Sequence, residues 1–341
     1  MEFWPKKKSP VRHEPLVLKS VFNPPGFTEE EIAQYPRNLD GIDSPESFIE
    51  AVDFDTLNEV FDSLSRKSEG ASEVHTLGHR VTRDIITFTE SNTEEVQSNL
   101  GSARIKEGTI TLNWKKTDEG KSKSYQTIRM LQTLAHEAAH IRAGYFMKDW
   151  ERGTIENLDY ESGFTLNSGL SQTDYSTRTE LKKGGLSLDE AVTEDIANEV
   201  LAEYLKRTGS AGYLKDPYLR KELGGGAYIV DRLILGVVID GLAQSIGVHR
   251  DEIWKGFVQA YMSGSTELWS LLADISAQLE NQPEIAELVS SLGSNVSMDK
   301  KDELSISQIM DRFNDPFYRW AILKRIEVLD AEKLKNVLGF H

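Results

Sequence analysis

The sequence contains no cysteine, and this absence removes several classes of protein at once. Without a thiol there is no disulfide framework, no thiolate zinc site, no iron–sulfur cluster and no cysteine nucleophile. Any transition metal must therefore be held by histidine and carboxylate side chains. Histidine is scarce as well, because the 341 residues include only seven.

Positive charge is also in short supply. Lys and Arg number 39 against 55 Asp and Glu, which gives a formal net charge of −16. An acidic chain is a poor general partner for nucleic acid, whose phosphates need a positive surface, and for an anionic membrane. We therefore expect neither nucleic acid nor a membrane surface as a partner.

Long hydrophobic runs are missing too. The most apolar stretch, 228–246, contains Asp231, Arg232, Asp240 and Gln244, which is typical of a core helix and not of a bilayer span. The basic residues near the N-terminus have no apolar run behind them, so they do not form a secretory signal. We expect a cytoplasmic protein.

The chain divides into three predicted parts. Residues 1–66 form an extended, Pro-rich lead-in followed by short helices. One is predicted to start at Thr28, which has capping-box spacing to Glu31, and one at Ser44, where Pro45 suits the first helical position. Residues 67–210 form the catalytic lobe, and residues 211–341 form a mainly helical C-terminal lobe. The predicted fold is α+β: a small β-sheet lobe with an active-site helix, followed by the helical lobe.

Within this plan, alternation of apolar and polar residues predicts strands over 80–89 and 102–114. Helical periodicity and helix-stop glycines predict the helices. Their predicted ranges are 53–66, 124–144, 187–207, 227–246, 250–262, 266–279, 283–292, 305–313 and 317–338.

One segment carries the chemistry. His136, Glu137 and His140 form an H-E-x-x-H pattern within a predicted helix. Positions i and i+4 of a helix share one face, so both imidazoles can bind one ion. Glu137 then lies beside the ion, where a general base can take a proton from a water whose pKa zinc lowers to about 7.

A catalytic zinc site generally needs a third protein ligand. The sequence offers Glu190 and Glu194, again one helical turn apart, near the start of the predicted helix 187–207. Glu190 can bind the metal while Glu194 accepts a hydrogen bond from a ligand histidine. Two alternatives stay open at this point: Glu190 can instead cap the helix from Ser187, and Glu194 or Glu199 can be the ligand.

These two patches together resemble the gluzincin metallopeptidases, a group that includes thermolysin and the alanyl-aminopeptidase type of enzyme. The resemblance covers about residues 105–205 and implies a zincin-like fold, with Glu190 as third zinc ligand and Glu194 bracing a ligand histidine. Asp189 stands where the family usually has Asn, and no aminopeptidase motif is present. The segment 194–198 faintly resembles regulatory metallopeptidases that act on repressors, and there Glu194 would be the ligand.

Peptide hydrolysis also needs a donor for the developing oxyanion. Gluzincins use a Tyr or His after the third ligand, and Tyr228 at the start of the helix 227–246 is our candidate, with His249 as the alternative. Tyr204 lies on the face of Glu190 but about 20 Å along the same helix axis, which is too far for one site. A second i, i+4 pair, His75 and His79, does not fall in a predicted helix.

The sequence thus predicts a zinc metallopeptidase in which His136, His140 and Glu190 bind Zn²⁺ and Glu137 is the general base. The substrate would be a peptide or protein, and an edge strand such as Thr109–Trp114 would pair with it. Two other functions stay open. The protein can be a regulatory protease with one protein target, or a helical interaction protein with a vestigial metal site.

Overall fold

The protein has an α+β fold in which a small three-stranded mixed sheet accompanies a mostly helical body. Several predictions lie outside the described residues: the helices within 266–338, the pair His75 and His79, and the capping role of Ser187. The division into three parts also stays a prediction. The computed structural model describes residues 42–65, 80–89, 100–104, 108–114, 123–143, 188–215 and 228–263, together with Ile275 and Leu279.

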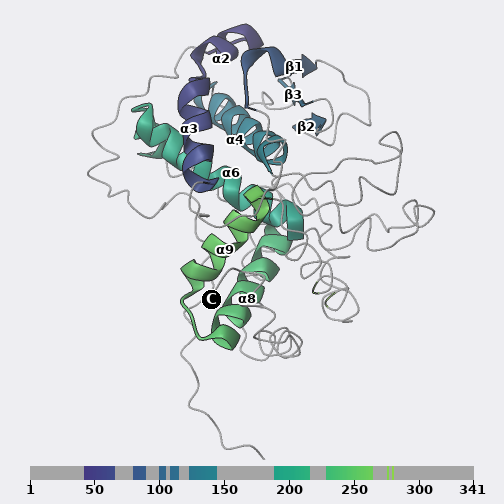
Figure 1. Ribbon diagram of the computed structural model, residues 1–341. Helices are drawn as coiled ribbons and strands as arrows, with labels where there is room; N and C mark the ends of the chain where they lie inside the picture. Colours follow the sequence, from purple (N-terminus) through teal and green to yellow (C-terminus); the bar gives the residue numbers. More distant parts are fainter. Residues whose placement is uncertain are drawn as a thin grey trace, which may run out of the picture.

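The described elements follow the predicted order. Figure 1 shows the sheet and α2 at one end of the molecule, α4 and α6 in the middle, and α8 and α9 as a pair at the other end. The helices are α2 (Pro45–Ala51), α3 (Phe54–Ser65), α4 (Lys123–Arg142), α6 (Leu188–Arg207), α8 (Ile229–Ile246) and α9 (Arg250–Ser263). The strands are β1 (Ile86–Thr89), β2 (Gly101–Arg104) and β3 (Thr109–Asn113), and short 3-10 helices cover Arg83–Ile85 and Ala211–Lys215.

The helix start predicted at Ser44 is confirmed, and the structure adds a capping box there. The helix predicted from Thr28 lies outside the described residues. The Ser44 side chain accepts the backbone N–H of Ser47, and the Ser47 side chain accepts the backbone N–H of Ser44. Pro45 occupies the first helical position, where its missing N–H has no helical partner to lose. These local bonds begin α2 and place Phe48 in an aromatic cluster with Phe88 and Trp114.

The sheet corrects two details of the sequence prediction. The order is β1-β3-β2, with β1 parallel and β2 antiparallel to β3. The range 102–114 is therefore two strands, separated by a turn at Gly108, whose φ of 65° suits glycine. Thr109–Trp114 is not an edge strand, because β3 is the central strand of the described sheet. β2 is the edge strand that packs on α4.

Helix α4 is buried more completely than an amphipathic pattern predicts. Fifteen of its residues, from Gln126 to Ile141, are buried. The reason is that β2 and β3 cover one side of α4 while α6 packs along another. Ile110 and Leu112 are fully buried residues of β3 in the same hydrophobic core. The two predicted metal-ligand histidines therefore lie in an interior position of the fold.

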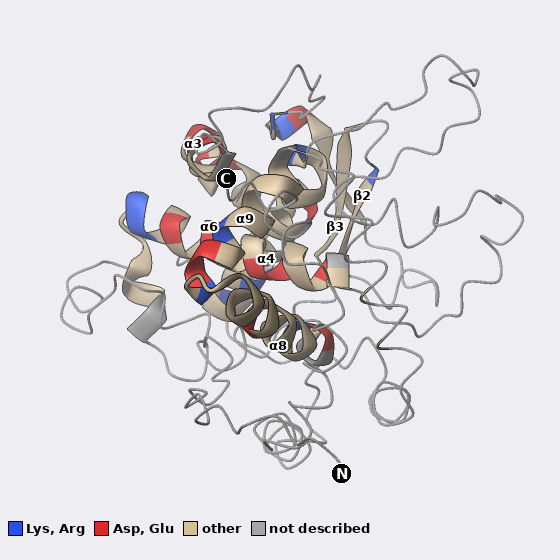
Figure 2. Cartoon of the chain, turned by 60° about the horizontal axis from the view of Figure 1, so that its bottom comes forward, with Lys and Arg blue, Asp and Glu red and all other residues tan. Residues whose placement is uncertain are grey.

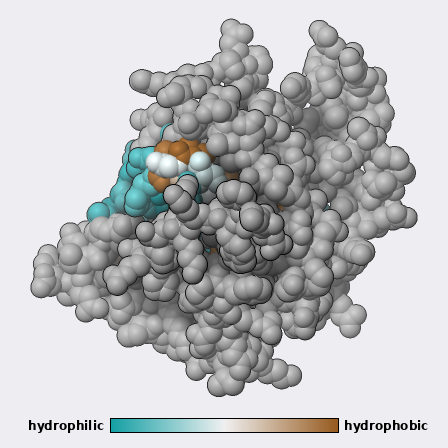
Figure 3. Space-filling view, turned by 90° about the horizontal axis from the view of Figure 1, so that it is seen from below, coloured by the Kyte–Doolittle hydropathy of each residue, from teal (hydrophilic) through white to brown (hydrophobic). Residues whose placement is uncertain are grey.

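Helix α8 is the most apolar of the described helices and packs against α6 and α9. In Figure 2 it is almost entirely tan, whereas α6 carries several acidic residues. Gly247, in the left-handed region at φ 80°, ends α8, and α9 begins at Arg250. Seen from below, the described part of the surface is mainly hydrophilic with one small apolar area (Figure 3).

No single helix in the described ranges is long and apolar enough to cross a membrane. Residues 231–246 and 250–262 pass that test of length and composition only as a pair bent by 111°. Their apolar side chains belong to the hydrophobic core, as Leu235 and Phe257 do with no exposed surface.

Candidate metal centre

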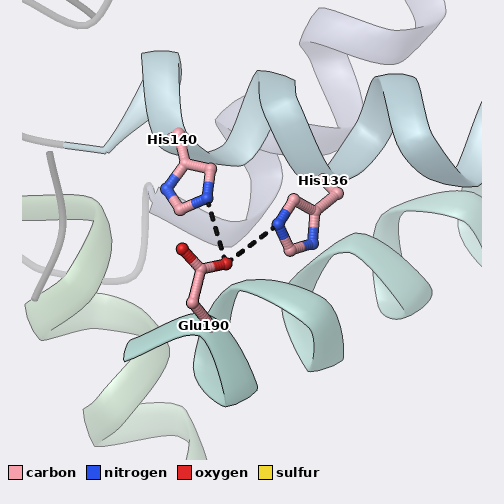
Figure 4. Close-up of side chains that lie close together, drawn as sticks. All are labelled: His136, His140 and Glu190. Atoms are coloured by element: carbon pink, nitrogen blue, oxygen red, sulfur yellow. Dashed lines mark hydrogen bonds and ion pairs between the residues drawn. The ribbon is translucent and has the colours of Figure 1, made fainter. Parts of the chain in front are cut away.

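The two histidines of the motif lie one turn apart on α4, as their spacing predicts. Their ring centroids are 5.0 Å apart, and both side chains are buried. Helix α4 turns both rings toward α6, which runs alongside it (Figure 4). The helix therefore delivers two imidazole nitrogens to one point.

Helix α6 brings Glu190 to the same point. Oε2 of Glu190 lies 3.1 Å from Nε2 of His136 and 3.5 Å from Nε2 of His140. Figure 4 shows the carboxylate reaching up from the first turn of α6 between the two rings. One ligand atom from each of these residues lies within 4.8 Å of the others.

These separations fit a bound zinc ion. A tetrahedral zinc with bonds of about 2.0–2.1 Å to nitrogen and oxygen places neighbouring ligand atoms about 3.3 Å apart. The two nitrogen–oxygen distances, 3.1 Å and 3.5 Å, lie on either side of that value. Two imidazoles and one carboxylate also leave a fourth position open, as catalytic zinc sites do.

Glu194 braces His136 from the other side of the ring. Its Oε2 lies 2.8 Å from Nδ1 of His136, and its Oε1 accepts a hydrogen bond of 3.1 Å from Gln132. Gln132 also donates to Oδ1 of Asn198, one turn further along α6. Since Glu194 accepts a hydrogen bond from the N–H at Nδ1, Nε2 of His136 is left to face Glu190.

A corresponding contact on His140 comes from α9. The hydroxyl of Tyr261 lies 3.4 Å from Nδ1 of His140 and 2.9 Å from Oγ1 of Thr193. A histidine that binds a metal through Nε2 carries its proton on Nδ1. The Tyr261 hydroxyl is therefore placed to accept a hydrogen bond from that N–H and to donate one to Thr193. Both histidines therefore have a partner that orients the ring.

Glu137 lies between this cluster and the sheet. Its side chain is 8% exposed, and its Cγ and Oε1 lie close under the backbone of Gly101 in β2. Burial raises the pKa of the Glu137 carboxyl, and the nearby histidine charges oppose that rise. A raised pKa makes the Glu137 carboxylate a stronger base, which suits a group that accepts and releases a proton.

The electrostatics of the cluster favour a cation. Burial alone would lower the pKa of His136, but its hydrogen bonds to Glu190 and Glu194 raise that pKa well above its usual value. Burial would raise the pKa values of the Glu190 and Glu194 carboxyls, but their contacts with the histidines lower both. The buried Glu137 and Glu194 and the partly exposed Glu190 thus surround two imidazoles, and a divalent cation can supply positive charge to these carboxylates.

The two candidate oxyanion donors are at opposite ends of α8. Tyr228 precedes the helix, and its ring is parallel to that of His136 with the centroids 6.2 Å apart. His249 follows the far end, is largely exposed and lies 3.5 Å from Asp251. Eighteen residues of helix separate the two by roughly 27 Å, so the structure brings only Tyr228 to the cluster.

Tyr228 also has an unusual backbone. It is the single non-glycine residue with positive φ in the described ranges, at φ 60° and ψ 33°. A bulky residue in the left-handed region is uncommon and strained, and such residues concentrate at functional sites. In this conformation the Tyr228 ring lies parallel to the ring of His136.

Tyr204 is far from this chemistry and has a structural contact. Its hydroxyl accepts a hydrogen bond of 2.9 Å from the backbone N–H of Asp53. Burial raises the pKa of Tyr204 to about 12. The residue ties the C-terminal half of α6 to the start of α3.

Sequence reasoning missed Gln132, Tyr261 and Gly101. Gln132 precedes His136 by one turn, so helical spacing could have identified it. A glycine inside a strand pattern signals a close backbone approach, which could have singled out Gly101. Nothing local marks Tyr261, because it is 121 residues away from His140 in the sequence.

Comparison with known proteins adds no family to this description. No protein-family model matches the chain, and neither a curated protein nor a solved structure matches it significantly.

Proposed function

We propose that this protein is a zinc-dependent metallopeptidase of the zincin type that hydrolyses peptide bonds. The observation that supports it most is the convergence of three ligand atoms with Glu137 beside them. The arrangement of His136, His140 and Glu190, with Glu194 behind His136, is the one that the resemblance to gluzincins implies. A cytoplasmic location stays part of the proposal.

The donor set favours zinc. Two neutral imidazoles and a carboxylate suit a borderline metal, whereas Mg²⁺ and Ca²⁺ prefer oxygen ligands alone. Zn²⁺ held by these residues would lower the pKa of a water bound to it to about 7 and polarise the substrate carbonyl.

The chain's own residues then divide the work. Glu137 accepts the proton of the attacking water at its carboxylate and passes it to the leaving nitrogen. The Tyr228 hydroxyl donates a hydrogen bond to the oxyanion that develops on the carbonyl oxygen. Glu194 and Tyr261 keep the two imidazole rings in the orientation that ligation requires.

The substrate would be an extended peptide that pairs with β2. Within the described residues, β3 occupies one side of β2 and no strand occupies the other. Added strands bind such edges through main-chain hydrogen bonds, which suits substrates of varied sequence. Because β2 packs on α4 near Glu137, a peptide at this edge would run past the general base.

The direct test is Glu137→Gln, which keeps the shape of the side chain and removes its basicity. We expect the variant to hold about one zinc, like wild type, and to lose hydrolysis of a peptide library by about 10²-fold or more. Glu203→Gln, on α6 beside Arg207, is the matched control and should retain activity. A fully active Glu137→Gln variant would refute the mechanism.

The same experiment separates the two alternatives. Zinc-loaded wild type that cleaves nothing in a broad library would favour a regulatory protease with one target. Purified protein that binds no zinc, and whose thermal stability does not respond to added zinc, would favour an interaction protein with a vestigial site.

A further inference from the structure

We propose that Gly101 of β2 is a positioning residue for Glu137, because its missing side chain leaves the space that the Glu137 carboxylate occupies. This inference rests on the function proposed above. It adds a residue of the sheet to a site that is otherwise built from helices.

The space above Glu137 is filled as soon as position 101 carries a side chain. A Cβ atom on Gly101 would lie 2.7 Å from Cγ2 of Thr133 and 3.0 Å from both Cγ and Oε1 of Glu137. These separations are well below ordinary carbon contacts of about 3.5–4.0 Å. Alanine is therefore too large here although it is the smallest side chain.

The backbone of Gly101 does not itself demand glycine. The described glycines with positive φ are Gly108, Gly209 and Gly247, whereas Gly101 has ordinary strand conformation. Its partner across β3 is Leu112, whose side chain is fully buried. The requirement for glycine is thus one of space on the α4 side, and not one of backbone torsion.

Of the two side chains that a Cβ at position 101 would meet, Glu137 is freer to move than Thr133. Thr133 is held in place, because its hydroxyl donates to the carbonyl of Arg129 at 3.0 Å and its β-branched side chain has few rotamers. Strand β2 is held by pairing with β3, which continues to Leu100 through a 2.8 Å hydrogen bond from Asn113. A glutamate side chain has three torsions and yields most easily.

Gly101 also presents its backbone to the side of β2 that faces away from β3, where the described sheet has no further strand. Leu100 lies opposite Asn113 and accepts its N–H, so this is a hydrogen-bonded antiparallel pair. Such pairs alternate with non-hydrogen-bonded ones, whose N–H and C=O groups point away from the partner strand. Gly101 therefore directs its N–H and C=O toward the edge, next to the residue whose carboxylate it accommodates.

The test compares Gly101→Ala with three other variants of the full chain. Thr133→Ser removes the 2.7 Å contact, and the double variant Gly101→Ala with Thr133→Ser keeps only the contacts with Glu137. Glu203→Gln, on α6 beside Arg207, is the control, as in the test of Glu137. Each variant is measured for thermal midpoint, for Zn²⁺ affinity by chelator competition, and for kcat and KM on fluorescein-labelled casein.

We expect Gly101→Ala to lose about 10–100-fold in kcat, since small misplacements of a catalytic group cost that much, with KM and Zn²⁺ affinity within about threefold of wild type. The double variant should recover the thermal midpoint but not kcat. Thr133→Ser and Glu203→Gln should stay close to wild type. Recovery of kcat together with stability in the double variant would overturn the proposal, because Gly101 would then be a packing residue only.

A crystal structure of Gly101→Ala provides a readout that does not depend on activity. It should show the Glu137 carboxylate displaced while His136, His140 and Glu190 keep their positions. If wild type cleaves nothing, the proposed function fails, but this structure still decides whether Gly101 positions Glu137. An unmoved Glu137 would refute the inference even in an active enzyme.

Discussion

Oε2 of Glu194 lies 2.8 Å from Nδ1 of His136, whereas Oε2 of Glu190 lies 3.1 Å from Nε2 of the same ring. The two carboxylates of α6, one turn apart, thus contact opposite nitrogens of one imidazole. Only Glu190 also approaches Nε2 of His140, at 3.5 Å. The two glutamates therefore differ in position: Glu190 belongs to the group of three residues that can hold a metal ion, whereas Glu194 contacts the opposite nitrogen of His136.

The first prediction separates these two roles. Glu190→Ala should abolish stoichiometric zinc binding, because it removes one of three ligands. Glu194→Ala should weaken the zinc affinity by about 10–100-fold and leave a measurable site, the usual effect of removing a partner behind a ligand. Metal analysis and chelator competition measure both, with Glu203→Ala as control. The reverse result would make Glu194 the ligand.

The second prediction concerns Tyr261, which links α9 to α4, the helix that carries His136 and His140. Tyr261→Phe removes the hydroxyl near His140 and should lower the zinc affinity about tenfold. The lost contact with Thr193 should also lower the free energy of unfolding by about 1 kcal/mol. Thr193→Val, which keeps the hydroxyl of Tyr261, should affect stability more than zinc affinity. Unchanged zinc affinity in Tyr261→Phe would show that α9 does not orient His140.

The third prediction tests the oxyanion donor. Tyr228→Phe keeps the ring beside His136 but removes the hydroxyl, so kcat should fall by about 10²-fold, the usual cost of losing one such donor. KM and zinc content should stay near wild type. His249→Ala is the matched control, since His249 lies at the other end of α8, and it should leave kcat unchanged. Full activity in Tyr228→Phe would assign the donor to another group.

The fourth prediction is a pH dependence away from the metal centre. Burial raises the pKa of Tyr204 from 10.0 to about 12, so the folded chain binds this proton more tightly than the unfolded chain. Stability should therefore be complete below pH 10 and should fall by up to about 3 kcal/mol as the pH rises toward 12. Chemical unfolding at pH 8 to 12 measures it.

Tyr204→Phe provides the comparison for this effect. The variant should be less stable by about 1 kcal/mol at pH 8, because the backbone N–H of Asp53 loses its acceptor. Its stability should then decline less steeply than that of wild type above pH 10. Parallel curves for the two proteins would show that another group causes the alkaline loss.

The sequence by itself determined what depends on local spacing. The i, i+4 relation of His136 and His140 and the helix start at Ser44 and Pro45 are properties of a few neighbouring residues. Helical hydrogen bonds join residues four apart, so these features can be recognised before the chain is folded. The same holds for Glu190 and Glu194, whose separation by one turn predicted two different roles.

Only the tertiary structure decided which distant residues complete the site. Tyr228, and not His249, lies beside His136, although the two segments are far apart in sequence. The same is true of the contact of Tyr261 with His140 and of the close approach of Gly101 to Glu137. The sheet order, which puts β3 in the centre and β2 at the edge, was likewise decided by pairing between strands. Such contacts follow from how hydrophobic faces pack and which strand edges meet, and no short-range pattern in the sequence records that outcome.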